Sequence, residues 1–192
     1  MKHIIFLRKE GDPMSQRILL LEGTYWADGN SRDLAEHFIE AAEAAGKTVV
    51  SPHLDTMNIN ECLSCNQCRN GLEGCYINDD DMDVIFEEIK KCDALVIITP
   101  LMYFGLPGLI KTALDRLYCL GPDYPKLNFA EVYTAKRSGN LAFLPAIAFH
   151  DLFVQHMGWE DWGVFAEGDL NQKHQVRGRM IYQQIYELGK KI

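Results

Sequence analysis

The 192-residue chain lacks long hydrophobic runs and has little positive charge. Its first apolar stretch runs only from Ile4 to Leu7, which is shorter than the roughly 7 to 15 residues of a signal-peptide core. No later run approaches the roughly 18 apolar residues of a membrane span. With 19 basic and 27 acidic side chains, the formal charge is −8, which disfavours nucleic-acid phosphates and anionic membranes as partners. We therefore expect a cytoplasmic protein that binds neither nucleic acid nor membrane.

Several motifs of known enzyme classes are also missing. The loop at residues 23–31 has neither the Gly-x-Gly-x-x-Gly dinucleotide fingerprint nor the Gly-Lys-Ser/Thr of a nucleoside-triphosphate loop. It has no Cys-x5-Arg phosphatase loop and no Gly-x-Ser-x-Gly elbow, and its six histidines lack zinc-binding spacing. These absences argue against hydrolases. The length and a composition of 47% hydrophobic and 24% charged residues predict one ordinary globular domain.

Strand-like and helix-like segments alternate along this domain. Short apolar runs predict strands at Arg17–Glu22, Lys47–Leu54, Ala94–Thr99, Phe129–Ala135 and Trp162–Ala166. Helical periodicity and end signals predict helices at Ser31–Gly46, around Met82–Ile89, from Pro107 through Leu117, at Leu144–Met157 and at Val176–Leu188. This order predicts an α/β doubly wound parallel sheet with helices on both faces and a ligand at the carboxyl ends of its strands. Residues 1–16 are expected to be an extension and 17–192 the domain.

A loop of small and polar residues joins the first predicted strand to the first predicted helix. It reads Gly-Thr-Tyr-Trp-Ala-Asp-Gly-Asn-Ser over residues 23–31. Backbone N–H groups at the helix start and the hydroxyls of Thr24 and Ser31 can donate to a phosphate, whose charge the helix dipole favours. The alternative is that Gly29, Asn30 and Ser31 only turn the chain and cap the helix. The place of the loop after a buried strand favours anion binding.

The loop after the strongest predicted strand carries three large apolar side chains, those of Met102, Tyr103 and Phe104. Pro100 and Gly105 restrict and bend its backbone. These three side chains either pack beneath the edge of the sheet or offer a surface to a flat ring. Three such residues on an exposed loop favour contact with a ligand.

Four of the six cysteines form one compact run. Its spacing is Cys62-x2-Cys65-x2-Cys68-x6-Cys75. In a reducing compartment such a run indicates metal, cluster or redox chemistry, because four thiolates can converge on one iron–sulfur cluster or zinc ion. The competing interpretation is a structural element without metal.

The other polar features predict structural roles. The aspartates at 79, 80, 81 and 83 fall where a helix begins and are expected to complement its positive end. Lys111 and Arg116 are expected to pair with Asp115 or other neighbours on their helix. Cys92 and Cys119 are isolated in the sequence, and we expect each to be a small buried apolar side chain.

Four motifs occur in a characteristic order. They are Gly23-Thr-x5-Asn30-Ser31, the cysteine run followed by Asp79-Asp80, Asp93-Ala-Leu-Val-Ile-Ile-Thr-Pro100-x2-Tyr103, and Lys111-x3-Asp115-Arg116. On these residues the chain resembles the NAD(P)H-dependent FMN reductase family of flavodoxin-like proteins, over most of residues 17–190. The resemblance implies a five-stranded flavodoxin-like fold that binds FMN noncovalently.

The resemblance also implies where FMN binds. The phosphate is expected in the 24–31 loop, the isoalloxazine ring against the 100–105 loop, and a third contact after the fourth strand. The implied cofactor-binding residues are Thr24, Tyr25, Asn30, Ser31, Pro100, Leu101, Met102, Tyr103, Phe104, Gly105, Thr134, Ser138 and Gly139. Many relatives carry Gly-Ser-x-Arg where this chain reads Gly-Thr-Tyr-Trp from residue 23. Lys136 or Arg137 would then supply the missing positive charge.

The cysteine run also resembles that of the iron–sulfur flavoproteins, in which it holds a 4Fe–4S cluster near the flavin. Plain reductases carry similar cysteines without a cluster, so both interpretations stay open. On the cluster interpretation, the metal ligands are Cys62, Cys65, Cys68 and Cys75.

The resemblance implies an oxidoreductase that passes electrons from NAD(P)H through FMN to a flavin, quinone or nitro-type acceptor. The flavin carries this chemistry, so we name no catalytic residue. The alternatives are an electron carrier in which a cluster and FMN exchange electrons, and a binding protein without turnover. A ring held at the edge of so small a domain is open on one side, which predicts a homodimer or homotetramer.

Overall fold

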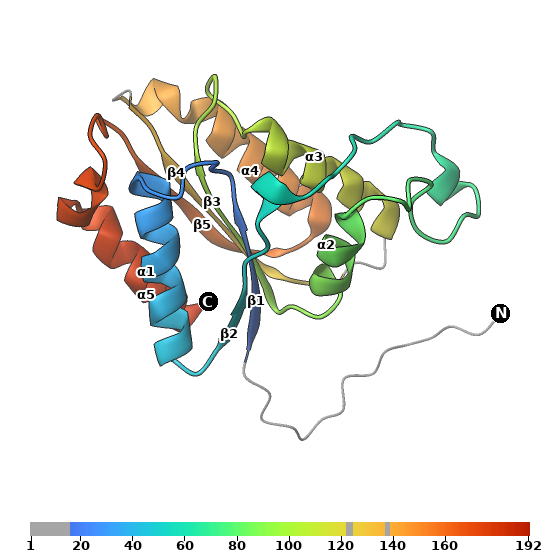
Figure 1. Cartoon of the computed structure of the whole chain (residues 1–192), viewed down its shortest axis with the longest axis horizontal. Coiled ribbons are helices and arrows are strands. Elements are labelled where there is room, and N and C mark those ends of the chain that lie inside the picture. The colour runs from blue at the N-terminus through green and yellow to red at the C-terminus, as the bar shows by residue number, and fades with distance from the viewer. Residues whose placement is uncertain (1–15, 122–124, 137–138) are drawn as a thin grey trace.

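The computed structural model describes residues 16–121, 125–136 and 139–192. Within these residues a single parallel sheet is covered by helices on both faces (Figure 1). No helix in this part of the chain is long and apolar enough to cross a membrane. The predicted N-terminal extension lies almost entirely outside the described residues.

The sheet contains five strands in the order β2-β1-β3-β4-β5, and every neighbouring pair is parallel. The strands are β1 Arg17–Glu22, β2 Thr48–Val50, β3 Ala94–Pro100, β4 Asn128–Thr134 and β5 Glu160–Glu167. In this order the chain winds outward from β1 in one direction and then in the other, which is the flavodoxin-like arrangement. The predicted fold class is confirmed.

Five helices cover the sheet. They are α1 Asn30–Ala44, α2 Met82–Ile89, α3 Gly108–Arg116, α4 Leu144–Met157 and α5 Met180–Lys191. Helices α1 and α5 pack on one face, and α2, α3 and α4 lie on the other (Figure 1). Successive residues of a strand point to opposite faces, so Ile18 and Leu20 join the first layer while Leu19 and Leu21 join the second. Both faces are buried, which explains why the strands read as continuous apolar runs.

Several predicted boundaries differ from the structure by one or two residues, and three differences have an identifiable cause. Strand β2 is shorter than predicted, because Pro52 lacks the N–H group that would continue the ladder and Leu54 begins a 3₁₀ turn. The predicted closing helix is divided into a 3₁₀ turn, Gln175–Gly178, and α5, because Arg179 between them has an extended backbone. Pro107 precedes α3 as its N-cap residue instead of opening its first turn.

Residues 61–76, which we call the cysteine arm, project from the side of the domain near α2 and α3 (Figure 1). The arm contains one 3₁₀ turn, Gln67–Arg69. Arg116 at the end of α3 holds both ends of the arm: Nη1 donates to the carbonyl oxygen of Asn60 at 2.8 Å, and Nη2 donates to that of Ile77 at 3.0 Å. The start and end of the arm are therefore fixed side by side on α3.

Asp80 completes this attachment. Its carboxylate accepts from Nη1 of Arg116 at 2.6 Å, and both side chains are almost completely buried. It also accepts from the backbone N–H groups of Asn60 at 2.9 Å and Met82 at 3.1 Å. The bond to Met82 confirms that Asp80 complements the start of α2. Lys111 pairs with Asp115 on α3, as predicted.

Replacing Asp80 by Asn should destabilise the protein by about 3 to 5 kcal/mol at pH 7, because Arg116 would keep a buried charge without its partner. Burial raises the pKa of Asp80, but the bonds from Arg116 and two backbone N–H groups lower it by more, so the net pKa lies below its usual value. Such a group stabilises the fold above its unfolded pKa of about 3.9 and loses this contribution as pH falls through the folded pKa.

The difference between wild type and Asp80→Asn should therefore shrink below about pH 4. Urea unfolding between pH 3 and pH 7 measures it. Asp115→Asn, which removes an exposed carboxylate of α3, is the matched control and should change stability by no more than about 1 kcal/mol. Equal effects of the two variants would show that the buried pair does not hold the arm.

Candidate functional site

Three loops meet at the edge of the sheet where its central strands end. They follow β1, β3 and β4, which are adjacent in the sheet (Figure 1). The N–H of Gly23 donates to the carbonyl of Ile98 at 3.1 Å, and that of Leu101 donates to the carbonyl of Thr134 at 2.9 Å. These bonds tie the first loop to β3 and the second to β4. The sheet thus brings together loops that are far apart in the sequence.

The loop after β1 ends at the uncapped start of α1. Gly29 precedes the helix and offers no side chain, so the first N–H groups of α1 have no side-chain cap. Thr24 Oγ1 accepts the N–H of Trp26 at 3.2 Å within the loop. Asn30, predicted as a cofactor contact, bonds to the backbone of Gln172 at 2.8 Å and Val176 at 2.9 Å. Its amide group therefore fastens α1 to the segment before α5.

Ser31 and Thr134, both predicted contacts, meet directly. Their hydroxyl oxygens lie 2.7 Å apart, although the residues are 103 positions apart in the sequence. Both side chains are buried at the junction of the first and third loops. A pair of hydroxyls has two protons, and the bond between them uses one. The other is left to donate to a ligand.

The arginines near the start of α1 are neutralised by carboxylates. Arg32 bonds to Glu22 at 2.8 Å and to Glu36 at 3.0 Å. Arg177 bonds to Asp33, a buried residue of the first turn of α1, at 2.7 Å. These arginines are therefore engaged and do not replace the arginine that this chain lacks in the loop.

Lys136 remains as a candidate source of positive charge. It lies two residues beyond Thr134, is exposed, and makes no ion pair with any described residue. Arg137 and Ser138, also named from the sequence, lie outside the described residues. Gly139, with φ 102°, has the left-handed backbone that glycine adopts readily, and its carbonyl accepts the N–H of Ala142 at 3.0 Å.

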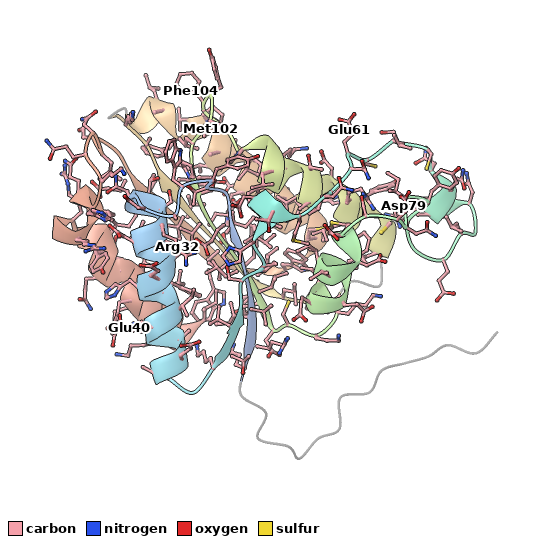
Figure 2. All side chains as sticks on the ribbon, viewed as in Figure 1. Arg32, Glu40, Glu61, Asp79, Met102 and Phe104 are labelled. Atoms are coloured by element: carbon pink, nitrogen blue, oxygen red, sulfur yellow. The ribbon has the colours of Figure 1, made fainter. Side chains whose placement is uncertain are left out.

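The loop after β3 is a tight turn that presents aromatic side chains. Met102 and Gly105 exchange two backbone hydrogen bonds, at 3.0 and 3.1 Å. Between them Tyr103 and Phe104 have φ 47° and 68°, a left-handed conformation that costs bulky residues free energy. Tyr103 is 99% exposed, and Met102 and Phe104 stand out from the edge of the sheet (Figure 2). A strained turn that holds aromatic groups in solvent suits contact with a flat ligand.

The other predicted residues of this loop have supporting positions. Pro100 is the last residue of β3 and is paired with Thr134 in register. Leu101 packs against the small cluster that surrounds buried Tyr133, and so faces inward. The site residues of this loop thus divide into an outward-facing turn and its support.

These three loops fit a flavin mononucleotide. An uncapped helix start and a spare hydroxyl proton suit one phosphate, and the exposed turn suits an aromatic ring. Further large apolar side chains are exposed beside this turn. On the first loop Tyr25 is 62% exposed and Trp26 is 74% exposed, and on the third loop Leu141 is 81% exposed. The edge of the sheet therefore offers both a polar end and an apolar end.

The cysteine arm gathers thiols around a cavity of about 30 Å³. Cys62 and Cys65 are exposed, whereas Cys68 and Cys75 are half-buried. All four line the cavity, together with Arg116, Tyr118 and Cys119 among others. In the described part of the chain, however, no three His, Cys, Asp or Glu side chains are arranged to hold a metal ion. The residue types suit a thiophilic group, but their arrangement in this structure does not.

Cys119 packs against the apolar core as predicted, but it is only half-buried and is not isolated from the other cysteines. It follows α3, on which the arm rests, and therefore lies beside Cys68 and Cys75. Burial and the nearby sulfurs of Cys75 and Cys68 raise its pKa to about 12. No spacing rule could indicate this contact, because it depends on how the arm packs. Cys92 is buried, as predicted, and burial raises its pKa to about 12.

Known proteins match this chain in sequence and in fold. The NADPH-dependent FMN reductase family matches residues 16–141. An iron–sulfur flavoprotein of Archaeoglobus fulgidus is 27% identical over 93 residues, which cover 48% of this chain and 41% of that protein. An FMN-dependent NADH:quinone oxidoreductase of Cellvibrio japonicus is 26% identical over 118 residues, covering 56% and 58%. The chain thus spans about half the length of these two curated relatives.

The fold is shared with solved oxidoreductases. An NAD(P)H:quinone oxidoreductase from Methanothermobacter marburgensis superimposes with a TM-score of 0.73 at 19% identity, covering 92% of this chain and 98% of that one. At this identity the likeness establishes the fold alone. The family match, by contrast, extends over well over half of the chain and includes β1 through β4 and the loops that follow β1 and β3. The chain belongs to the NADPH-dependent FMN reductase family of flavodoxin-like oxidoreductases.

Proposed function

We propose that the protein passes electrons from NAD(P)H through FMN to a small-molecule acceptor of the flavin, quinone or nitro type. The observation that carries this proposal is that one edge of the sheet has a part suited to bind a phosphate and a part suited to contact a flat ring. The buried hydroxyls of Ser31 and Thr134 mark the first, and the exposed turn at Tyr103 and Phe104 marks the second. FMN has one phosphate and one flat ring, and matches both.

The phosphate end favours a mononucleotide. The loop after β1 has the uncapped start of α1 and Thr24, but lacks the glycines with which a dinucleotide-binding loop approaches a pyrophosphate. The proton left over from the Ser31 and Thr134 pair can donate to a phosphate oxygen. Lys136 supplies positive charge without a competing carboxylate among the described residues. We therefore expect FMN to bind more tightly than FAD.

The ring end supplies contact area and orientation. When bound, FMN would supply the hydride and electron transfer between NAD(P)H and a second substrate. Met102, Tyr103 and Phe104 would hold one side of the ring, and the hydrogen-bonded turn that carries them would set its position at the edge of the sheet. The residues named here are binding residues. Their contribution to rate is to orient the ring so that donor and acceptor reach it in turn.

Tyr103→Ala should raise the dissociation constant of FMN about tenfold, because aromatic contact and buried area together are worth about 1.4 kcal/mol. Quenching of flavin fluorescence during titration measures the affinity. Tyr76→Ala removes a 54% exposed tyrosine from the cysteine arm and is the matched control, with affinity expected to stay unchanged. Wild-type affinity in the Tyr103 variant would refute the assignment of the turn.

Turnover is tested on the FMN-loaded wild-type protein. It should oxidise NADH or NADPH when a quinone, a nitro compound or free flavin is present. Tight FMN binding without any NAD(P)H oxidation would instead favour a binding protein without turnover. Equal or tighter binding of FAD would contradict the mononucleotide assignment.

We also propose that two copies of the chain cover the flavin from its open side. The loops at the edge of the sheet expose a group of large apolar side chains: Tyr25, Trp26, Met102, Tyr103, Phe104, Leu141 and Leu144. Apolar groups at this density are typical of an interface, and two-fold symmetry makes the same group available on both copies. A homodimer is the simplest assembly, and a homotetramer is the alternative.

Light scattering of the FMN-loaded protein at micromolar concentration should give the mass of a dimer or tetramer. Trp26→Glu should shift the protein toward monomer, because a charge would be buried at the contact. Val84→Glu, at a 49% exposed position on α2 away from these loops, is the matched control and should leave the mass unchanged. A monomer in the wild type would reject this assembly.

A second candidate function is an electron carrier with a 4Fe–4S cluster on the cysteine arm. One observation favours it: Cys62, Cys65, Cys68 and Cys75 all line the same cavity. The similarity to an iron–sulfur flavoprotein supports the same proposal. The cluster would supply one-electron transfer, and the arm would hold it apart from the edge of the sheet at which FMN is proposed to bind.

Protein purified and reconstituted with iron and sulfide without air should then contain four irons per chain. Cys65→Ser should abolish iron binding and the broad visible absorbance, while FMN still binds through its separate loops. Flavin without iron after reconstitution would exclude the carrier and leave the reductase.

A further inference from the structure

A wide groove of about 860 Å³ lies between the cysteine arm and α2 (Figure 1). One side is formed by residues 83, 86, 87 and 90, which recur at the spacing of one helix face. The other side is formed by residues 72–79, where the chain returns from the arm. None of the residues that line this groove belongs to the three loops proposed to bind FMN. The groove is therefore a second surface with a separate role to explain.

The floor of the groove is apolar. Phe86 of α2 is buried, and Ile77 and Leu120 are half-buried. Leu72 is 39% exposed at the side of the groove that the arm forms. An apolar floor that nothing in the described part of the chain covers suits contact with another apolar segment.

The rim of the groove is acidic. Glu87 is paired with Lys90 at 3.2 Å and with Lys91 at 3.3 Å. The other carboxylates of the rim are exposed and make no ion pair with any described residue; they are those of Glu73, Asp79 and Asp83. An apolar floor inside an acidic rim fits a short apolar peptide with basic residues on both sides of it.

The chain enters the described structure beside this groove. The guanidinium of Arg17 donates to Glu88 of α2 at 2.7 and 2.9 Å, and Glu88 adjoins Glu87 of the groove. Lys9 is eight positions before Arg17, a length of chain that spans up to about 28 Å. Helix α2, with its eight residues, is about 12 Å long. The residues that precede Arg17 can therefore reach the whole length of the groove.

Residues 2–9, which we call the basic segment, have the composition that the groove fits. They read Lys-His-Ile-Ile-Phe-Leu-Arg-Lys and lie outside the described residues. Four adjoining apolar residues, Ile4 to Leu7, lie between basic ones, and the segment contains no carboxylate. Its apolar centre matches the floor, and its basic ends match the free carboxylates of the rim.

We propose that the basic segment docks in this groove of its own chain, with Ile4 to Leu7 against the apolar floor and the basic residues near the acidic rim. A segment tethered by a short length of chain has an effective concentration in the millimolar range. Modest contact with the floor is therefore enough for docking, whereas a separate peptide would need a much higher affinity.

Docking divides the thiols of the protein into two groups. Cys75 and Cys119 line the groove and are covered by the basic segment, whereas Cys62 and Cys65 lie on the exposed part of the arm outside it. The basic segment thus limits the access of reagents and ligands to one group of thiols and leaves the other open. This role is independent of whether the arm holds a metal.

The contact is tested on the full chain with a carbodiimide, which joins an amine directly to a carboxylate that touches it. The sample is an equal mixture of unlabelled and nitrogen-15-labelled protein. Peptide mapping should find Lys2 or Lys9 joined to a carboxylate of the rim, with both peptides carrying the same label. Crosslinks of mixed label would place the basic segment on a second copy, and no crosslink would mean that it does not dock. Either result would overturn the proposal.

A variant of the basic segment tests the cover over Cys75. Phe6→Asp should speed the alkylation of Cys75 by iodoacetamide about fivefold or more, because an apolar side chain is lost and a carboxylate meets the acidic rim. Alkylation of Cys62 in the same sample should keep its rate. Met14→Asp introduces the same charge outside the basic segment and is the matched control. An unchanged rate at Cys75 in Phe6→Asp, or an equal rise in both variants, would contradict docking.

A variant of the groove tests the other side of the contact. Leu72→Lys places a positive charge beside the floor and should also speed alkylation of Cys75 and lower the yield of crosslinks. Leu63→Lys, at a 59% exposed position of the arm outside the groove, is the matched control and should leave both unchanged. Both leucines are exposed, so the fold is expected to be retained. Equal behaviour of the two variants would show that the basic segment does not dock in this groove.

Discussion

Parallel pairing of all five strands is the constraint on which the site depends. Each crossover must return the chain to the opposite edge of the sheet, so every strand ends at the same edge. The loops after β1, β3 and β4 meet there because these strands are neighbours in the order 2-1-3-4-5. The same edge of the sheet therefore carries the hydroxyl pair of Ser31 and Thr134 and the aromatic turn after β3. The chemistry of the site follows from this geometry.

Charged groups fasten the three helices α2, α3 and α4 on their face of the sheet. Arg116 and Asp80 join α3 to the start of α2 and to both ends of the cysteine arm. His150 of α4 lies between Glu131 at 2.8 Å and Asp161 at 3.0 Å. Burial lowers the pKa of His150, but these carboxylates raise it by more. Buried ion pairs add little net stability compared with apolar contacts, but they have strict geometry, so they set where an element sits.

The cysteine arm illustrates how packing and polar contacts divide their roles. The part of the arm that carries the cysteines is largely exposed, so apolar burial contributes little to holding it. Its position comes from the hydrogen bonds that Arg116 and Asp80 provide at its two ends and from Arg69, whose guanidinium lies 4.1 Å from the centre of the Tyr118 ring. Within this arm the thiols of Cys62 and Cys65 remain exposed to solvent. Such an arrangement suits ligand binding more than it suits rigid packing.

The sequence alone determined the elements and their order. Apolar runs such as Ala94 to Thr99 and the helical periodicity of residues 31–46 report burial directly, because burial depends on local hydrophobic pattern. The same reasoning found the loops at 23–31 and 100–105, since a loop that follows a buried strand in a doubly wound sheet reaches the ligand edge. The sequence pattern predicted the end of β2 and the start of α5 less well, because the first depends on Pro52 and the second on the extended backbone of Arg179.

Tertiary structure alone decided which distant residues touch. The hydroxyls of Ser31 and Thr134 are 103 residues apart, and Cys119 lies 44 positions beyond Cys75 yet shares its cavity. Asn30 was predicted from the sequence to contact the cofactor. Its side-chain amide is instead hydrogen-bonded to the backbone of Gln172 and Val176, in the segment before α5. Local pattern reports whether a side chain is buried. Its partner is set by how the sheet and helices pack, and no spacing along the chain encodes that choice.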